Sequence, residues 1–311
     1  MTSDESFRVV VVGVGHLGRH HARILSRMSG VDLVAVVDTQ SAVRESVARE
    51  AGTRAVSDVS GLPSDLDGVV VAVPTEAHAR VALPFLQTGI AVLVEKPMST
   101  SIAEADAMLD AAVSSGATLA VGHTERYNPA VTTALPLVSE PRFIEVHRLS
   151  TFAARSLDID VVFDVMIHDL DVLLALVDSE PVSIEAVGVP VLTSRVDIAN
   201  ARIRFESGCI ANLTASRISR DRVRKLRIFQ PQAYVSIDCA DQQVEEWHVI
   251  HGPAGEPVIE GGSVEVATAE PLERELADFV RASVSRNRPL VSGQDGRRAL
   301  ALAQRIAEVM R

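Results

Sequence analysis

Hydrophobic residues in the first 123 positions follow two alternating patterns. Short runs that are apolar at nearly every position are typical of strands buried on both faces of a parallel sheet, and they occur at residues 8–12, 33–37, 68–73, 91–94 and 118–121. Between them, apolar residues recur with helical spacing, which predicts helices at residues 20–28, 41–51, 77–87 and 102–113. Ser99 or Thr100 is a candidate cap for the last helix. The alternation predicts an α/β fold with a doubly wound parallel sheet.

After residue 123 the pattern changes. Strand-like segments, several with alternating apolar and polar faces, occur at residues 143–149, 183–189, 201–205, 209–215, 225–229 and 233–238. One strong helix is predicted at residues 163–177, and the tail from residue 271 to 311 is helical, with a break near Pro289 and Gly293. We therefore expect two domains, residues 1–123 with the parallel sheet and residues 124–311 with an α+β fold and an open, mainly antiparallel sheet.

Composition excludes several classes of protein. Hydrophobic residues make up 47% and charged residues 23% of the 311 positions, as in an ordinary soluble globular protein. No apolar run approaches the roughly 20 residues that cross a bilayer, and the first residues are acidic where a signal peptide is basic. With only Cys209 and Cys239 and no CxxC motif, we expect neither a disulfide framework nor a zinc site. A cytoplasmic location without a membrane partner is the expectation.

The net charge of −11 makes nucleic acid an unexpected partner, because the chain repels polyanions. A phosphorylated small molecule can still bind in a local basic pocket. Arg217, Arg220, Arg222, Arg224, Lys225 and Arg227 form one basic cluster. Phosphate binding, a solvated strand edge and a subunit contact are three open interpretations of this cluster.

A glycine-rich motif follows the first predicted strand. Gly13-Val14-Gly15-His16-Leu17-Gly18 has the form GxGxxG and opens a helix. In that context Gly13 allows a tight turn, Gly15 lets the backbone approach a pyrophosphate, and Gly18 lets the helix pack against the strand. Asp38 ends the second strand, about 20 residues later, where a carboxylate accepts hydrogen bonds from a ribose 2′-hydroxyl and repels a 2′-phosphate. The motif predicts binding of NAD in preference to NADP.

Two other segments follow predicted strands at the edge where ligands of such sheets bind. Pro74, Thr75 and His78 come after the third clear strand, so that Thr75 and His78 are candidates to face the cofactor. The alternative is capping of a helix by Thr75 and a surface position for His78. Glu95-Lys96-Pro97 follows the next strand, where Lys96 is a candidate donor or acid–base group, although a lone loop lysine is more often only solvated.

Polar residues also mark the predicted helix at residues 163–177. Asp160, Asp164, His168 and Asp171 are spaced four, four and three apart, which places them on one side of a helix that is otherwise apolar. Such a stripe is expected to face a cleft, with Asp164 able to orient His168. A solvated helix face and a metal site are the two alternatives. Arg126 or Tyr127, at the domain junction, is a further candidate for contact with cofactor or substrate.

Together these segments resemble the Gfo/Idh/MocA family of NAD(P)-dependent oxidoreductases. The resemblance is carried by residues 13–18, 74–78, 95–97 and 126–129, by the pair Asp164 and His168, and by the helical tail. It implies a Rossmann domain followed by an open antiparallel sheet whose exposed face builds homodimers or homotetramers. Within the family, residues 122–129, 164–171 and 217–229 look most like the UDP-N-acetylglucosamine 3-dehydrogenase branch.

The resemblance also implies a mechanism. Lys96 and His168 are expected to contact the substrate hydroxyl, with His168 as general base, Asp164 orienting it and Lys96 stabilising negative charge on oxygen. It further implies that Glu95, Lys96 and Arg126 lie at the cofactor, that the peptide bond before Pro97 is cis, and that no metal takes part. The implied reaction is hydride transfer from a sugar or sugar-nucleotide alcohol to NAD. An inositol or free-sugar dehydrogenase, an NAD-dependent glycosidase and a non-catalytic NAD-binding regulator are the alternatives.

Overall fold

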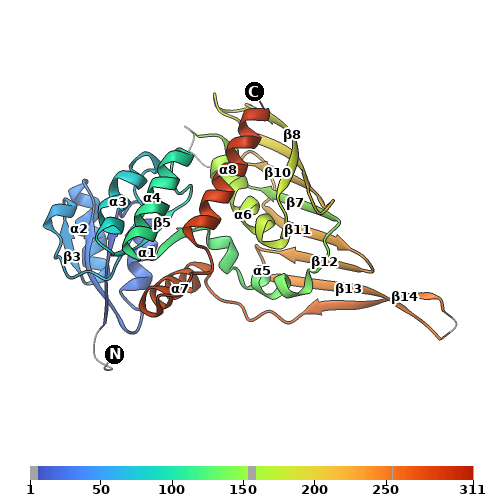
Figure 1. Cartoon of the computed structure of the whole chain (residues 1–311), viewed down its shortest axis with the longest axis horizontal. Helices are drawn as coiled ribbons and strands as arrows, with labels where there is room; N and C mark the ends of the chain where they lie inside the picture. Colours follow the sequence, from blue (N-terminus) through green and yellow to red (C-terminus); the bar gives the residue numbers. More distant parts are fainter. Residues whose placement is uncertain (1–5, 153–158, 254, 311) are drawn as a thin grey trace. The chain divides into compact units, whose positions relative to one another are not determined.

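The computed structural model describes residues 6–152, 159–253 and 255–310. The chain divides into two compact units. Figure 1 shows the helices and strands of the chain, coloured by residue number. The first unit contains the chain up to His123 together with Leu272–Arg297, and the second contains Thr124–Pro271 and Arg298–Arg311. The segment Leu272–Arg297, which we expected in the second domain, therefore packs with the first unit.

The first unit is built on a six-stranded sheet in which every pair of neighbours is parallel, in the order β3-β2-β1-β4-β5-β6. Its strands are β1 (Phe7–Val12), β2 (Val31–Val37), β3 (Arg54–Val56), β4 (Gly68–Val71), β5 (Ala91–Glu95) and β6 (Leu119–Gly122). Its helices are α1 (Gly18–Leu25), α2 (Ser41–Ala51), α3 (His78–Gln87), α4 (Ile102–Ser115) and α7 (Pro271–Ser285). This arrangement confirms the predicted Rossmann fold.

Valine-rich strands form the core of the first unit because both faces of the sheet are covered. Val9, Val10 and Val11 are fully buried in β1. The tail helix α7 completes this core: the ring of Phe279 packs edge-on against Phe7, with 6.1 Å between the centroids. Ser101, rather than Ser99 or Thr100, caps α4 by accepting a hydrogen bond from the N–H of Glu104. The expected capping residue was therefore wrong by one or two positions.

The second unit contains an eight-stranded sheet in the order β14-β13-β12-β11-β7-β10-β9-β8, antiparallel except between β7 and β10. The strands are β7 (Phe143–Leu149), β8 (Pro181–Val189), β9 (Ile198–Phe205), β10 (Ile210–Ser216), β11 (Val223–Gln230), β12 (Ala233–Asp238), β13 (Gln243–His251) and β14 (Pro257–Val264). Its helices are α5 (Pro129–Ala134), α6 (Ile167–Leu176) and the C-terminal part of α8 (Gly293–Val309). The expected open, mainly antiparallel sheet is confirmed.

Short helical turns connect several of these elements. They are η1 (Val59–Gly61), η2 (Thr75–Ala77), η3 (Thr124–Tyr127), η4 (Leu135–Leu137) and the π-helical turn η5 (Val162–Met166), which runs directly into α6.

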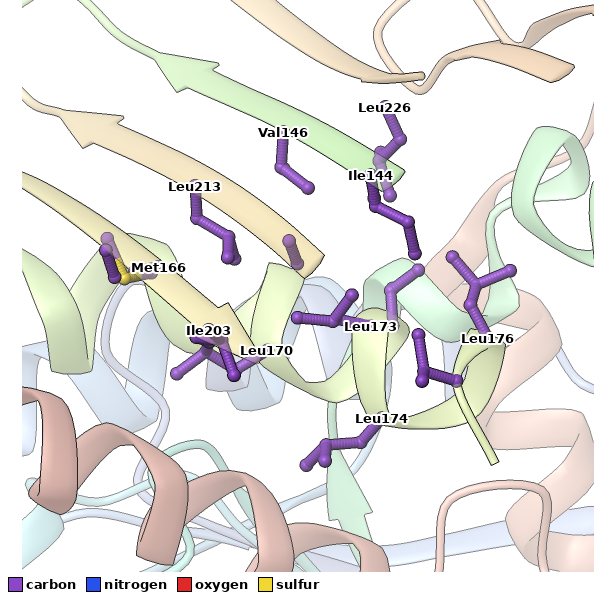
Figure 2. Close-up of a cluster of buried hydrophobic side chains, with 14 of the residues drawn as sticks. Ile144, Val146, Met166, Leu170, Leu173, Leu174, Leu176, Ile203, Leu213 and Leu226 are labelled. Atoms are coloured by element: carbon purple, nitrogen blue, oxygen red, sulfur yellow. The ribbon is translucent and has the colours of Figure 1, made fainter. Parts of the chain in front are cut away.

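One face of the eight-stranded sheet carries the core of the second unit. Figure 2 shows Ile144, Val146 and Leu213 on the strands, close to Leu170 and Leu173 of α6. Each of these two leucines is fully buried and contributes about 1.5–3 kcal/mol of transfer free energy. The opposite face of the sheet is more exposed to solvent, as the half-buried residues that alternate with buried ones along β7 indicate. Among the described residues, no helix is both long and apolar enough to cross a membrane.

Candidate active site

The glycine-rich turn between β1 and α1 has a backbone that only glycine permits at two positions. Gly13 has a φ of 86°, and a Cβ atom on it would lie 2.7 Å from the backbone of Ala72. A Cβ atom on Gly18 would overlap the carbonyl oxygen of Gly13. Gly15 is exposed, and no atom lies within 4 Å of the place that its Cβ would occupy. The backbone at Gly15 is therefore open to a bound group.

The start of α1 adds hydrogen-bond donors to this turn. Leu17, the residue before the helix, provides no side-chain cap, and the N–H groups of Arg19 and His20 donate to the carbonyl oxygens of Gly15 and Leu17. His16 and Leu17 are both exposed. N–H groups at the start of a helix attract anions, phosphates in particular. The turn, the open backbone at Gly15 and these donors fit the pyrophosphate of a nicotinamide dinucleotide.

Asp38 follows β2 and supports the same turn. Its Oδ2 accepts a hydrogen bond from the N–H of Val14 at 3.0 Å, and its Oδ1 accepts one from the N–H of Gln40 at 2.9 Å. Asp38 is half-buried, and a carboxylate has about four lone-pair sites, so each oxygen can accept another bond. The residue can therefore hold the turn and still accept a hydrogen bond from a ribose hydroxyl.

A buried carboxylate supports the turn that carries Lys96. The Oε2 atom of Glu95 accepts a hydrogen bond from the backbone N–H of Lys96 at 3.1 Å, and its Oε1 lies 2.8 Å from Nε2 of His21 on α1. Burial alone would raise the pKa of Glu95, but the hydrogen bond from His21 and the charges of His21 and Lys96 lower it overall. The peptide bond between Lys96 and Pro97 is cis, which confirms the expectation drawn from the family.

His78 is a buried connector rather than a surface residue. Its Nδ1 lies 2.9 Å from the carbonyl oxygen of Pro97, and its Nε2 lies 2.9 Å from that of Val73. Burial lowers the pKa of His78, and the two carbonyl oxygens oppose this effect because each can accept a hydrogen bond from a ring N–H. Its ring links the segment after β4 to the turn after β5.

The structure also tests the alternative interpretation in which Thr75 caps a helix. Neither Pro74, which precedes η2, nor Ala77, which precedes α3, makes a side-chain capping bond, so α3 is not capped by Thr75. Capping by Thr75 and a surface position for His78 are therefore both wrong. Contact of Pro74, Thr75 or His78 with a cofactor stays a prediction.

The expected stripe of four polar residues is wrong at its first member. Asp160 precedes the helix, where its Oδ1 accepts a hydrogen bond from the N–H of Val196 at 3.1 Å. Asp171 lies in α6 but is buried. Asp164, in η5, and His168, in α6, are both half-buried and four residues apart, which places them on neighbouring turns of the same side. These two residues remain the candidates for acid–base chemistry.

Arg126 holds the loop of the second unit against α6. It is buried, and its Nη1 donates to the carbonyl oxygen of Asp171 at 3.2 Å and lies 3.4 Å from Oδ1 of the same residue. Asn128, two residues later, caps α5 by accepting a hydrogen bond from the N–H of Ala130 at 3.0 Å. In the structure Arg126 therefore positions α6, and its contact with a cofactor stays a prediction.

A second buried arginine holds the residue next to His168. Arg148 of β7 donates from Nε and Nη2 to the two carboxylate oxygens of Asp169, at 2.8 and 2.7 Å, and from Nη1 to Glu125 at 2.7 Å. Burial opposes the charge on Arg148, but Asp169 and Glu125 outweigh it and raise the pKa of the guanidinium. The turn of α6 that follows His168 is thus held by two ion pairs, one at Asp169 and one at Asp171.

Three of these supporting residues were not singled out from the sequence. Arg148 follows the apolar positions Ile144 and Val146 on the buried face of β7, so its alternation was a usable signal. Glu125 and His21 carry no comparable signal, because their partners are distant in the sequence. Glu125 pairs with Arg148, 23 positions later, and His21 pairs with Glu95, 74 positions later. Within the described ranges, no three His, Cys, Asp or Glu side chains are grouped so as to hold a metal ion.

The sequence matches known domains over most of its length. Residues 7–123 match the oxidoreductase family with the NAD-binding Rossmann fold, and residues 140–235 match the Gfo/Idh/MocA C-terminal domain. The UDP-N-acetylglucosamine 3-dehydrogenase of Acidithiobacillus ferrooxidans is 38% identical over 304 residues, which cover 96% of each chain. An inositol 2-dehydrogenase of Rhizobium meliloti is 26% identical over 95% of this chain and 94% of its own.

Solved structures agree with these matches. The UDP-N-acetylglucosamine 3-dehydrogenase GnnA from Acidithiobacillus ferrooxidans superposes with a TM-score of 0.90 at 36% identity, over 97% of both chains. A myo-inositol 2-dehydrogenase from Lactobacillus plantarum has a TM-score of 0.81 at 20% identity over 98% of this chain and 97% of its own, which shows the shared fold alone. The chain belongs to the Gfo/Idh/MocA family and is an oxidoreductase with an NAD-binding Rossmann domain.

Proposed function

We propose that this protein is an NAD-dependent dehydrogenase that oxidises the 3-hydroxyl of UDP-N-acetylglucosamine or of a closely related nucleotide sugar. The observation that carries the proposal is the relative with that activity in its name, which is 38% identical over 96% of each chain. The chain also keeps, among its own residues, the lysine and histidine that such a reaction requires, Lys96 and His168.

Oxidation of a secondary alcohol removes a proton from oxygen and a hydride from the same carbon. The nicotinamide ring, when bound, accepts the hydride. We assign His168 as the general base that takes the hydroxyl proton, and Asp164, four residues earlier, as the group that orients its ring. Lys96 polarises the oxygen and stabilises the negative charge that develops on it. The hydrogen bond from the Lys96 N–H to Glu95 supports this role because it fixes the backbone of the lysine.

The preference for NAD over NADP is assigned to Asp38. A half-buried carboxylate after β2, held by the N–H groups of Val14 and Gln40, would repel a 2′-phosphate. The comparison that tests it is kcat/KM with NAD against kcat/KM with NADP, in the wild type and in Asp38→Ser. The wild type should prefer NAD, and the variant should lose most of that preference. A wild type that prefers NADP would contradict the role of Asp38.

The test of the proposed function is a direct assay with two catalytic variants. NADH should form from NAD with UDP-N-acetylglucosamine, and Lys96→Ala and His168→Asn should each lower kcat by about 10²-fold or more while the affinity for NAD stays within a factor of about two. His147→Asn is the matched control, since His147 is half-buried on β7, on the face of the sheet opposite to α6. Wild-type rates in both catalytic variants would reject the assignment.

A second candidate activity is the oxidation of inositol or of a free sugar. It is favoured by the inositol 2-dehydrogenase that is 26% identical over 95% of this chain. The same assay separates the two, because myo-inositol or glucose would then give NADH and the nucleotide sugar would not. Cleavage of a glycoside with no net NADH would instead indicate an NAD-dependent glycosidase.

Self-association through the exposed face of the eight-stranded sheet is also proposed. That face carries an aromatic group in which Phe143 stacks on Phe229 with 5.7 Å between ring centroids, and Phe229 packs on Tyr234 at 5.0 Å. Phe229 and Trp247 are each more than a third exposed, which favours coverage by a second copy. Light scattering coupled to size-exclusion chromatography should give the mass of a dimer or tetramer, and Phe229→Glu should reduce it.

A further inference from the structure

Five of the six members of the basic cluster, all except Arg220, fall into two groups according to whether they pair with a carboxylate. Three members have carboxylate partners. Arg217 is buried and donates from Nε to Asp197 at 2.8 Å, Lys225 lies 3.3 Å from Asp238, and Arg227 lies 3.7 Å from Glu145. These three positive charges are therefore balanced within the second unit.

Arg222 and Arg224 differ from these three. In the part of the chain that the structure describes, neither guanidinium has a hydrogen bond or a salt bridge to a carboxylate. Arg222 is exposed, whereas Arg224 is half-buried on β11 directly opposite Arg148 of β7. Burial and repulsion from Arg148 lower the pKa of Arg224, with an opposing effect of Glu125. Arg148 forms ion pairs with Asp169 and Glu125, whereas its neighbour Arg224 forms no ion pair in the described part of the chain, so the guanidinium of Arg224 is a candidate to bind an external anion.

A cavity of about 270 Å³ lies at these two arginines. Its lining consists of Arg222, Val223, Arg224, Lys225, Asp238, Ala240 and Asp241. Asp238 is already neutralised, because it pairs with Lys225 and accepts hydrogen bonds from the N–H groups of Ala240 at 3.0 Å and Asp241 at 3.2 Å. Among the residues that line the cavity, Asp241 adds one exposed carboxylate against Arg222 and Arg224, so the lining retains positive charge. Whole ligands usually need about 300–1,000 Å³, so this volume suits one compact anionic part of a ligand.

The cavity is linked to the histidine helix within the second unit. Arg224 is the cross-strand partner of Arg148, and Arg148 holds Asp169 with two hydrogen bonds. Asp169 is the residue next to His168 in α6. The cross-strand pair of Arg224 and Arg148 and the ion pair of Arg148 and Asp169 therefore connect the cavity with the residue next to the proposed general base.

We propose that Arg222 and Arg224 bind the diphosphate of a nucleotide-linked sugar. The inference rests on the proposed function and extends it, because it names the group by which the enzyme would tell a nucleotide sugar from inositol or a free sugar. In UDP-N-acetylglucosamine the diphosphate is attached to C1 and the hydroxyl to be oxidised is on C3 of the same ring. Arginine is the side chain best suited to this anion, since its planar guanidinium donates two parallel hydrogen bonds to phosphate oxygens.

The test measures anion binding separately from catalysis. Isothermal titration of the full-length wild type, Arg222→Gln and Arg224→Gln with UDP, pyrophosphate, uridine and NAD is the central experiment. UDP and pyrophosphate should bind the wild type, with an affinity that falls as the salt concentration rises. In each variant their affinity should be lower by about tenfold or more. Uridine should bind weakly throughout, and NAD affinity should be unchanged. Arg227→Gln is the matched control because Arg227 lies on the same strand, on the other face, and pairs with Glu145.

Stability gives an independent readout. Since Arg224 has no salt bridge to a carboxylate and is repelled by Arg148, Arg224→Gln should leave the melting temperature of the ligand-free protein unchanged or raise it. A merely structural arginine would lower it on replacement. Arg222 is exposed, so its variant keeps the test valid even if Arg224→Gln fails to fold.

Three outcomes would overturn the inference. The first is a wild type that binds neither UDP nor pyrophosphate, and the second is a pair of variants that bind UDP as tightly as the wild type. The third is a loss of affinity in the variants that is equal for NAD and for UDP. The proposed function is judged separately by NADH formation from UDP-N-acetylglucosamine. Anion binding that depends on both arginines, without turnover of the nucleotide sugar, would support the anion site and reject that function. Formation of NADH from UDP-N-acetylglucosamine with an unchanged KM for that substrate in both variants would support the function and reject the anion site.

Discussion

The imidazole of His21 donates from Nε2 to Oε1 of Glu95 at 2.8 Å, with both side chains buried. The second oxygen of Glu95 accepts the N–H of Lys96, so the helix after the glycine-rich turn is tied to the turn that carries the candidate catalytic lysine. Both elements belong to the first unit. His21 is therefore a positioning residue for Lys96, although it is not itself placed at reacting atoms.

Replacement of His21 should destabilise the protein. His21→Ala would leave the buried Glu95 carboxylate with one hydrogen bond fewer, which costs about 1–3 kcal/mol of the free energy of unfolding. Urea denaturation followed by circular dichroism measures this difference. His20→Ala is the control, because His20 is exposed and its removal should change stability by less than about 0.5 kcal/mol. Equal urea midpoints for the two variants would show that the pair contributes nothing.

The same carboxylate predicts a dependence of stability on pH. The pKa of Glu95 in the folded protein is lowered from its ordinary value of 4.5, because the hydrogen bond and charge of His21 together with Lys96 outweigh burial. Its stabilising contribution is therefore complete well above pH 4.5 and is lost as the pH falls through the folded value. Unfolding free energies of the wild type and Glu95→Gln should converge as the solution is acidified. Two parallel curves would contradict this linkage.

The buried Arg148, beside the helix that carries His168, should contribute more to the free energy of unfolding than an arginine at the surface. Arg148→Met would leave Asp169 and Glu125 buried without their cation, at a cost of about 3–5 kcal/mol in unfolding free energy. Arg227→Met breaks a half-exposed pair with Glu145 and should cost less than about 1 kcal/mol. Thermal and urea unfolding of both variants give the comparison. A loss in Arg148→Met no larger than that in Arg227→Met would show that the buried network is not stabilising.

The two cysteines should be unreactive while the protein is folded. Cys209 and Cys239 are both buried, and burial raises the pKa of Cys209 to about 11 and that of Cys239 well above its ordinary range. Because the thiolate is the reactive form, labelling by a thiol reagent such as DTNB should be slow in buffer and rapid in denaturant. Rapid labelling of one cysteine under native conditions would show local opening around it.

The sequence predicted the parts of the fold in which local pattern and burial agree. The uniform valine runs predict strands buried on both faces, and β1 and β4 form where expected. The alternation of buried and half-buried positions predicts a strand buried on one face, and β7 forms where expected. The short strand β3 was missed because only three residues pair at an exposed sheet edge. Strands β13 and β14 were missed because β13 is largely polar and β14 contains Gly261 and Gly262, which are unfavourable in strands.

The candidate site was predictable as a set of motifs and not as a network. The GxGxxG motif and Asp38 could be singled out from the sequence, because the glycine turn is local and the aspartate follows it at the spacing that is typical of a dinucleotide-binding unit. The partners of these residues could not, because the bonds from His21 to Glu95 and from Arg148 to Asp169 form only after distant strands and helices pack. The stripe on the histidine helix failed for a local reason. The π-helical turn η5 follows Asp160, so this residue lies outside the helix that was expected to hold it.

The return of the tail to the first unit has a consequence for how the chain is made. Phe279 and Leu276 of α7 belong to the core around β1, and the N–H of Val121 in β6 bonds to the carbonyl of Val291. During translation, the first 123 residues of the nucleotide-binding unit are made first, yet its last core side chains follow only after residues 124–271 of the second unit have been made. Synthesis of the opening 123 residues is thus not enough to complete that half, because its core also needs side chains from Leu272–Arg297.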